Sequence, residues 1–190
     1  SQVNVGSTDN VLNKLDIKDG TLAFEADAPQ SKANGIVTVN DLNLAGGVIS
    51  VTGSSSWANT SPVVAPGVSI LEQDAGNVLM TLIDAKNVSG NVNDLTLSIN
   101  GTKVTTAEQA ILSTITQGGV DAAQATYNYG LTDVNNSQGG LYVKYGLTAL
   151  KLLTDGADAL LLATAGGNTN QTLNALLSGD GGLNIDASKG

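Results

Sequence analysis

The stretch that decides the fold runs from Val120 to Leu152 and reads VDAAQATYNYGLTDVNNSQGGLYVKYGLTALKL. It holds all four tyrosines of the chain, and the tripeptide YGL occurs in it twice, at 129–131 and at 145–147. Each copy follows a short run of alternating residues, and an Asn- and Gly-rich segment, 132–140, lies between the copies. Two aromatic, strand-prone runs around such a segment predict a pair of strands joined by a loop. Because tyrosine and leucine bury much apolar area, we expect the densest core here.

A repeat with a constant offset of 27 residues precedes this stretch. Residues 14–24 (KLDIKDGTLAF) align with residues 41–51 (DLNLAGGVISV), and in each copy two short alternating strands flank a glycine that marks a bend. A strand–bend–strand unit that recurs every 20–50 residues or so is typical of a solenoid, in which each coil stacks on the next at about 4.8 Å. The aligned pairs are Leu15/Leu42, Ile17/Leu44, Gly20/Gly47, Leu22/Ile49 and Phe24/Val51.

Two further segments interrupt the repeat. Residues 54–67 are rich in serine and contain two of the three prolines, which predicts a loop that leaves the stack, and Trp57 lies within it. Residues 105–115 begin with a T-x-x-E capping box and place Leu112 and Ile115 on one helical face. Because isoleucine and threonine favour strands, this segment is either one short helix or a β segment.

The composition excludes several classes of function. The chain has 190 residues and a net charge of −9, and all eight basic residues are lysine, so we expect no nucleic-acid partner and no attraction to anionic lipid. It has no His, Cys or Arg, which removes the groups on which most active sites and metal sites depend. We therefore predict no enzyme activity, no catalytic residue, no cofactor and no metal site. The start at Ser-Gln-Val, without Met or leader, predicts a mature or excised segment.

Acidic pairs near turns are the remaining candidates for chemistry. Enzymes that cleave polysaccharides use clustered carboxylates, but most acidic pairs in this chain flank glycine or loop positions, as solvated turn residues do. A lyase-type site would also need arginine or clustered lysine, so a polysaccharide-cleaving enzyme is a remote alternative. The pairs are Asp16/Asp19, Glu25/Asp27, Glu72/Asp74 and Asp155/Asp158.

The aromatic residues are candidates for packing and for binding. In a strand, Tyr127 and Tyr129 share one face, whereas Tyr142 and Tyr145 do not. We expect the tyrosines to clamp the core and Trp57 to fold back on the side of the stack. The alternative is that Trp57 and the tyrosines form a platform for a carbohydrate or protein partner.

Several motifs follow one another in a fixed order. An N-G turn at 100–101 and the T-x-x-E segment at 105–108 precede A-T-Y-x-Y-G-L at 125–131 and G-L-Y-V-x-Y-G-L-T at 140–148. Repeats of the type G-T-L-x-F come before them, and L-x-G-x-G-x-L-x-I-D-A follows at 177–187. This order resembles the C-terminal part of the passenger domain of AIDA-type bacterial autotransporters, the autochaperone or pertactin-like region.

The resemblance implies an all-β fold, a right-handed parallel β-helix with a hairpin-like autochaperone unit. It divides the chain into coils at 1–104, with a loop excursion at about 54–67, the aromatic unit at 105–152, and further coils at 153–190. It also implies a non-catalytic stem segment that nucleates folding and secretion of a passenger, which its own outer-membrane barrel exports to the bacterial cell surface.

Passengers of this type serve adhesion, autoaggregation or biofilm formation, and their partners are host surfaces or the same protein on neighbouring cells. Independently, a solenoid grows by adding coils to an existing stack, so the segment with the largest side chains is the best candidate for the first stable unit. The alternative function is an adhesive binding module in its own right.

Overall fold

The computed structural model describes residues 1–26, 32–53, 70–74, 78–104, 110–164 and 170–188. Within these residues the chain is all-β, as predicted, apart from the five-residue helix α1 (Ile70–Asp74) and two short 3-10 turns. The strands are β1 (Gln2–Asn4), β2 (Asn10–Ile17), β3 (Thr21–Ala26), β4 (Lys32–Leu44), β5 (Val48–Gly53), β6 (Val78–Gly90), β7 (Thr96–Ile99), β8 (Thr102–Val104), β9 (Ala110–Gln117), β10 (Val120–Asn135), β11 (Gln138–Leu152), β12 (Leu160–Ala163), β13 (Leu176–Gly179) and β14 (Leu183–Asp186).

The two copies of the N-terminal repeat stack on each other in parallel. Strand β2 pairs with β4 and β3 with β5 at the offset that the alignment predicts, so Leu15 lies beside Leu42 and Phe24 beside Val51. A third layer follows, in which β4 pairs with β6 and β5 with β7. Its offset is larger, with Leu42 beside Val88, because the segment between β5 and β6 is longer than the segment between β3 and β4.

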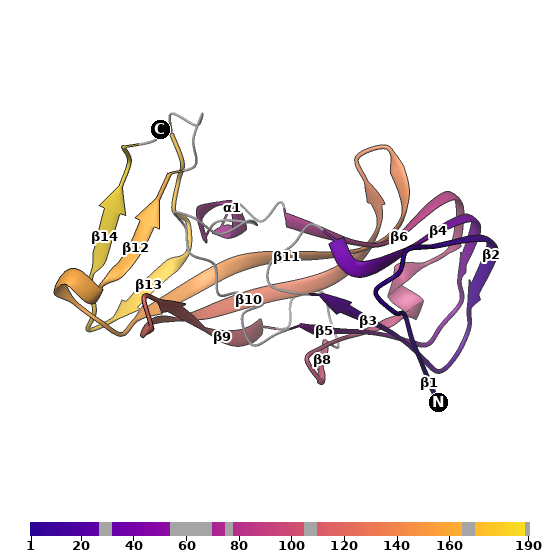
Figure 1. The fold of residues 1–190 in the computed structure, drawn as a ribbon, viewed down its shortest axis with the longest axis horizontal. Helices are drawn as coiled ribbons and strands as arrows, with labels where there is room; N and C mark the ends of the chain where they lie inside the picture. The colour runs from indigo at the N-terminus through magenta and orange to yellow at the C-terminus, as the bar shows by residue number, and fades with distance from the viewer. Residues whose placement is uncertain (27–31, 54–69, 75–77, 105–109, 165–169, 189–190) are drawn as a thin grey trace.

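The strands form three sheets. One has the order β1-β3-β5-β7-β8, the second has the order β2-β4-β6-β11-β10-β9 with β13 added to β11, and the third pairs β12 with β14. The second sheet thus takes strands from all three segments predicted from the sequence. Figure 1 shows an elongated body with the N-terminal strands at one end and β12 and β14 at the other, and β10 and β11 run between these ends.

The core lies between the inward faces of the strands. Strand β5 alternates, with Ile49 and Val51 at 0% exposure, and Phe24 of β3 and Leu44 of β4 are also at 0%. Each fully buried side chain of this size stabilises the fold by about 1.5–3 kcal/mol. Pairing of successive parallel strands therefore completes the hydrogen-bond ladder and the core together.

Strand β4 changes direction at a corner. Its alternating burial is interrupted by two consecutive exposed residues, Asn40 and Asp41, after which Leu42 points inward again. The corresponding residues of β6, Lys86 and Asn87, are exposed in the same way. The Asn40 side-chain amide donates to the Asn13 side-chain oxygen at 3.0 Å, which joins β2 to β4 at this corner.

The tyrosine-rich stretch folds as an antiparallel hairpin of β10 and β11, as the paired runs predict. The predicted length of the loop, 132–140, is wrong. Strand pairing continues to Asn135 opposite Gln138, so only a two-residue turn remains. Asn136 in this turn has a φ of 54°, which asparagine tolerates better than most residues. The hairpin extends this far because the first part of β11 also pairs with β6, from Gly139 opposite Ala85 onward.

Of the two alternatives for residues 105–115, a short helix or a β segment, the described part of the segment adopts the β segment. Residues 110–117 form strand β9, which pairs antiparallel with β10, while the capping box at 105–108 lies outside the described residues. Leu112 is 62% exposed and Ile115 is buried, so the two do not share a face. The β-branched residues of β9 and the partner strand beside them override the local helix signal.

Candidate functional site

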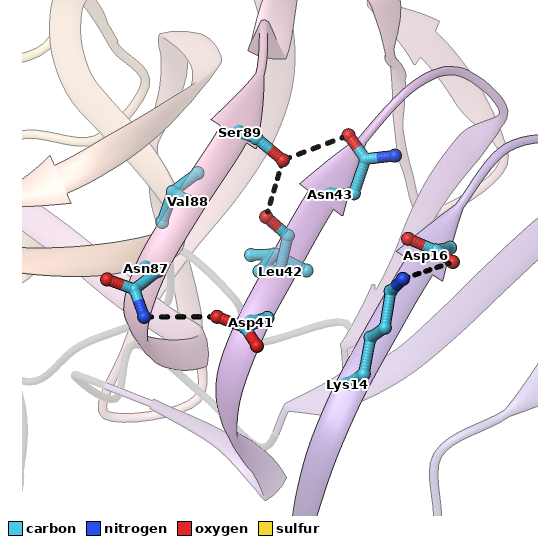
Figure 2. Close-up of a pocket in the computed structure, with 8 residues that line it drawn as sticks. All are labelled: Lys14, Asp16, Asp41, Leu42, Asn43, Asn87, Val88 and Ser89. Atoms are coloured by element: carbon cyan, nitrogen blue, oxygen red, sulfur yellow. Dashed lines mark hydrogen bonds and ion pairs between the residues drawn. The ribbon is translucent and has the colours of Figure 1, made fainter.

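A polar groove runs across the outer face of β2, β4 and β6, and Figure 2 shows its lining. Its volume is about 420 Å³. The three strands supply carboxylate, amide, hydroxyl and ammonium groups from positions just beyond the corner of β4. The residues of the polar groove are Lys14, Asp16, Asp41, Leu42, Asn43, Asn87, Val88 and Ser89.

Parallel register arranges the polar side chains of the groove in two rows. Lys14 lies beside Asp41, which lies beside Asn87, and this is the first row. The second row is formed in the same way by Asp16, Asn43 and Ser89. Successive side chains of a strand alternate between faces, so the residues between the rows point to the core while both rows face outward. Neighbours within a row are about 4.8 Å apart along the hydrogen-bonding direction.

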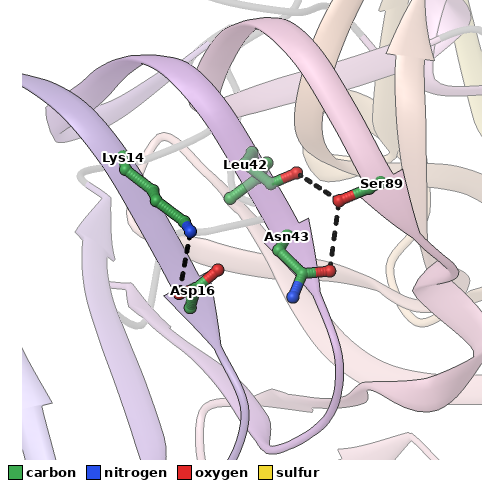
Figure 3. Close-up of polar contacts among 5 residues, drawn as sticks. All are labelled: Lys14, Asp16, Leu42, Asn43 and Ser89. Carbon is green, nitrogen blue, oxygen red and sulfur yellow. Dashed lines mark hydrogen bonds and ion pairs between the residues drawn. The ribbon is translucent and has the colours of Figure 1, made fainter.

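Hydrogen bonds hold the side chains of β4 and β6 in place. The Asn87 amide donates to Asp41 Oδ1 at 3.0 Å in the first row. In the second row the Ser89 hydroxyl donates toward Asn43 Oδ1 at 3.2 Å and the Leu42 carbonyl at 3.5 Å, as Figure 3 shows. These contacts fix the orientation of each amide and leave further polar atoms directed outward.

The charged residues of the groove are two aspartates and one lysine. Lys14 Nζ lies 3.8 Å from Asp16 Oδ2, and these side chains are 64% and 31% exposed. An ion pair this long and this exposed holds its partners only loosely. The groove therefore contains one loosely held ammonium group, that of Lys14, beside carboxylate and amide groups that hydrogen bonds hold in place.

Three of the other acidic residues singled out in the sequence accept hydrogen bonds from backbone N–H groups. Asp19 and Asp155 each accept a hydrogen bond from the backbone N–H of the following glycine. Asp74, at the end of α1, is 6% exposed and accepts from the backbone N–H groups of Asn174 and Ala175, both at 2.6 Å. Asp27 lies outside the described residues. Among the described residues, no cluster of three or more His, Cys, Asp or Glu side chains is arranged to hold a metal ion.

The four tyrosines are buried, at 0–3% exposure. Three of them form one cluster: the Tyr129 ring centroid lies 5.6 Å from that of Tyr145 and 6.0 Å from that of Tyr127. Tyr129 and Tyr145 are opposite each other on β10 and β11, which brings the two YGL copies together. Trp57, expected to fold back on the side of the stack or, in the alternative, to share a binding platform with the tyrosines, lies outside the described residues.

Tyr142 is separate from this cluster, as its position in the strand predicts. Its hydroxyl donates to Asp84 Oδ1 at 2.7 Å and lies 3.0 Å from the Gly139 carbonyl oxygen, so it ties β11 to β6. Burial raises the pKa of Tyr142, and the hydrogen bond to Asp84 raises it further. Burial also raises the pKa of Tyr127 and of Tyr129, with a smaller contribution from neighbouring tyrosines.

The polar groove is a candidate site that was not predicted from the sequence. The alignment of the two repeat copies already places Lys14 beside Asp41 and Asp16 beside Asn43, so two strands of the groove could have been found. The third strand could not, because Asn87 follows Asp41 at a different offset.

Two similar proteins are known from Escherichia coli (strain K12). The chain is 32% identical over 197 residues to the uncharacterized protein YuaQ, and the match covers 100% of the chain. It is 29% identical over 195 residues to the uncharacterized lipoprotein YdeK, with 92% of the chain covered. The chain spans 14% of the length of each of these curated relatives. No protein-family model and no solved structure matches the chain. In the described part of the chain, every helix is too short or too polar to cross a membrane.

Proposed function

We propose that the chain is a non-catalytic stem segment of a bacterial autotransporter passenger, and that its aromatic hairpin starts the folding of the stem. One observation carries this proposal: an antiparallel hairpin joins the two YGL copies, and parallel strand pairs with an offset of 27 residues occur in the chain both before this hairpin and at its C-terminal end. Such pairs are β2 with β4 before the hairpin and β11 with β13 after it, where Ala149 lies beside Leu176.

The stem in this proposal is a right-handed parallel β-helix. The stacking of β2, β4 and β6 on one side and of β1, β3, β5 and β7 on the other supports it. The handedness follows from the rule that crossover connections between parallel strands of one sheet are right-handed in about 98% of cases. The buried columns of apolar residues across these layers also support a continuous stacked core.

A role in nucleation is supported by the distances along the chain. The hairpin closes through a two-residue turn, and β9 joins β10 just as directly, whereas each parallel pair of the N-terminal repeat must close a loop of 27 residues. Short loops cost less conformational entropy, so local pairs form first. The three-strand unit β9–β10–β11 also contains the tyrosine cluster. Burial of this large apolar area stabilises the unit as soon as its strands pair.

A location at the cell envelope is supported by the relative YdeK, whose name describes a lipoprotein. The absence of cysteine is compatible with export, because a chain that crosses the periplasm without thiols cannot be trapped there by disulfides. In this role the stem holds the adhesive parts of the passenger away from the membrane and supports autoaggregation.

The experiment is a deletion of residues 105–152 from the full-length gene product with an epitope tag at the N-terminal end of the passenger. We expect display of the tag on intact cells to fall strongly while the translocator barrel remains in the outer membrane. The amount of barrel is the control, because a general loss of expression would lower both. Normal display after the deletion would contradict the proposed role in folding and secretion.

A further inference from the structure

The polar groove has a feature that a stem does not require: a fixed, concave arrangement of hydrogen-bonding side chains on an outer face. We propose that it is a binding site for a neutral, hydroxyl-rich carbohydrate chain. This inference rests on the groove alone and stands whether or not the chain is an autotransporter stem.

The size and rigidity of the groove fit a small section of an oligosaccharide. Its volume of about 420 Å³ lies in the range of roughly 300–1,000 Å³ typical of small-molecule sites. Its floor is the backbone of three hydrogen-bonded strands, and Leu42 beneath it is 1% exposed. A site built on strands loses little conformational entropy on binding.

The hydrogen-bonding groups suit hydroxyl groups, each of which donates and accepts. A carboxylate accepts about four hydrogen bonds, so Asp41 can bind hydroxyl groups while it accepts from Asn87. The Asn43 side chain accepts from Ser89 through its oxygen, and its NH₂ group is a donor that points away from this contact in Figure 3. The groove therefore presents both acceptors and a donor to a ligand, which suits sugar hydroxyls.

Other classes of ligand fit less well. Two carboxylates against one lysine disfavour phosphate, sulfate and acidic sugars, and the whole chain carries a net charge of −9. Most lining side chains are polar or charged, which disfavours an apolar peptide or an acyl chain. With two carboxylates, the groove also lacks the dense acidic cluster that a tight calcium site needs.

Nuclear magnetic resonance titration of the chain tests this proposal. The probes are maltohexaose, cellohexaose and chitohexaose, and a heparin hexasaccharide is the anionic control. We expect at least one neutral probe to bind with a dissociation constant on the order of 1 mM, with shifts concentrated at Asp41, Asn43 and Asn87. Asp41→Ala should weaken this binding about tenfold or more, because it removes hydrogen bonds to a charged acceptor.

Two further variants make the test decisive. Asn43→Trp fills the groove without removing Asp41 and should abolish binding. Thr38→Ala removes an exposed hydroxyl of the same strand outside the groove and should leave binding unchanged. Thermal melts of all variants separate loss of binding from loss of fold. Failure of all three neutral probes to bind, or preferential binding of heparin, would overturn the proposal. Self-association that Asp41→Ala abolishes, without carbohydrate binding, would overturn it in favour of a second copy of the chain.

Discussion

Replacement of Tyr129 by alanine tests whether the tyrosine cluster stabilises the molecule. Tyr129 is 1% exposed and contacts the rings of Tyr127 and Tyr145. Removal of a buried aromatic side chain costs about 3–5 kcal/mol, through lost burial and the cavity that remains. We therefore expect Tyr129→Ala to lower the free energy of unfolding by about 3–5 kcal/mol, which lowers Tm by roughly 6–20 °C for a chain of this length.

The assay is urea unfolding followed by circular dichroism, with Leu112→Ala as the matched control. Leu112 is 62% exposed on β9, the strand next to β10, and a substitution at so exposed a site should change stability by less than about 0.5 kcal/mol. Equal, small effects of the two substitutions would refute the idea that the cluster is the densest part of the core.

Stopped-flow kinetics extend this comparison to the order of folding. If the hairpin forms first, Tyr129→Ala should mainly slow folding, whereas Val51→Ala in the parallel layers should mainly speed unfolding. Val51 is also fully buried, at 0% exposure, so the two sites differ in their place in the fold and not in burial. The opposite assignment of the two rate effects would refute nucleation by the hairpin.

Three further predictions concern the backbone, an anchor and pH. Gly90→Ala should destabilise the chain more than Gly101→Ala in thermal melts. Both glycines have φ near +82°, where an alanine costs about 1–2 kcal/mol. A Cβ at Gly90 would also overlap the Leu44 carbonyl oxygen, whereas a Cβ at Gly101 would lie in open space. Asp74→Asn should lower the free energy of unfolding by about 1.5–3 kcal/mol and speed hydrogen exchange at the amides of residues 174 and 175, since it weakens charge-assisted bonds. Stability should fall as pH rises above about 10, because Tyr127, Tyr129 and Tyr142 ionise near their ordinary pKa in the unfolded chain, whereas burial raises their pKa in the folded chain; a fall of the urea midpoint with rising pH measures this loss.

The parallel register could be predicted because it leaves a pattern in the sequence. Leu15 and Phe24 recur as Leu42 and Val51, since paired parallel strands place similar residues side by side in the core. The pairing of β4 with β6 leaves no such pattern at a constant offset, because the intervening segment has a different length. The length of the hairpin could not be predicted from its own residues, since its end depends on pairing with β6, which is distant in the sequence.

Local sequence signals are a poor guide to secondary structure where pairing with another strand determines it. The capping box and apolar spacing at 105–115 favour a helix, yet β10 offers a full edge of hydrogen-bonding groups to residues 110–117. The polar groove was missed for a related reason. Its residues are ordinary polar positions in each strand, and only the pairing of the strands brings Asp41, Asn43 and Asn87 to one face.

The most direct test of the proposed function is the display of point variants on living cells. Flow cytometry of a tagged full-length protein would compare Tyr129→Ala with Leu112→Ala at equal expression of the barrel. The proposal predicts that display of Tyr129→Ala falls well below that of Leu112→Ala, because the folding of the stem then starts more slowly. Equal display of the two variants, with Tyr129→Ala destabilised in vitro, would contradict a role of the aromatic hairpin in secretion.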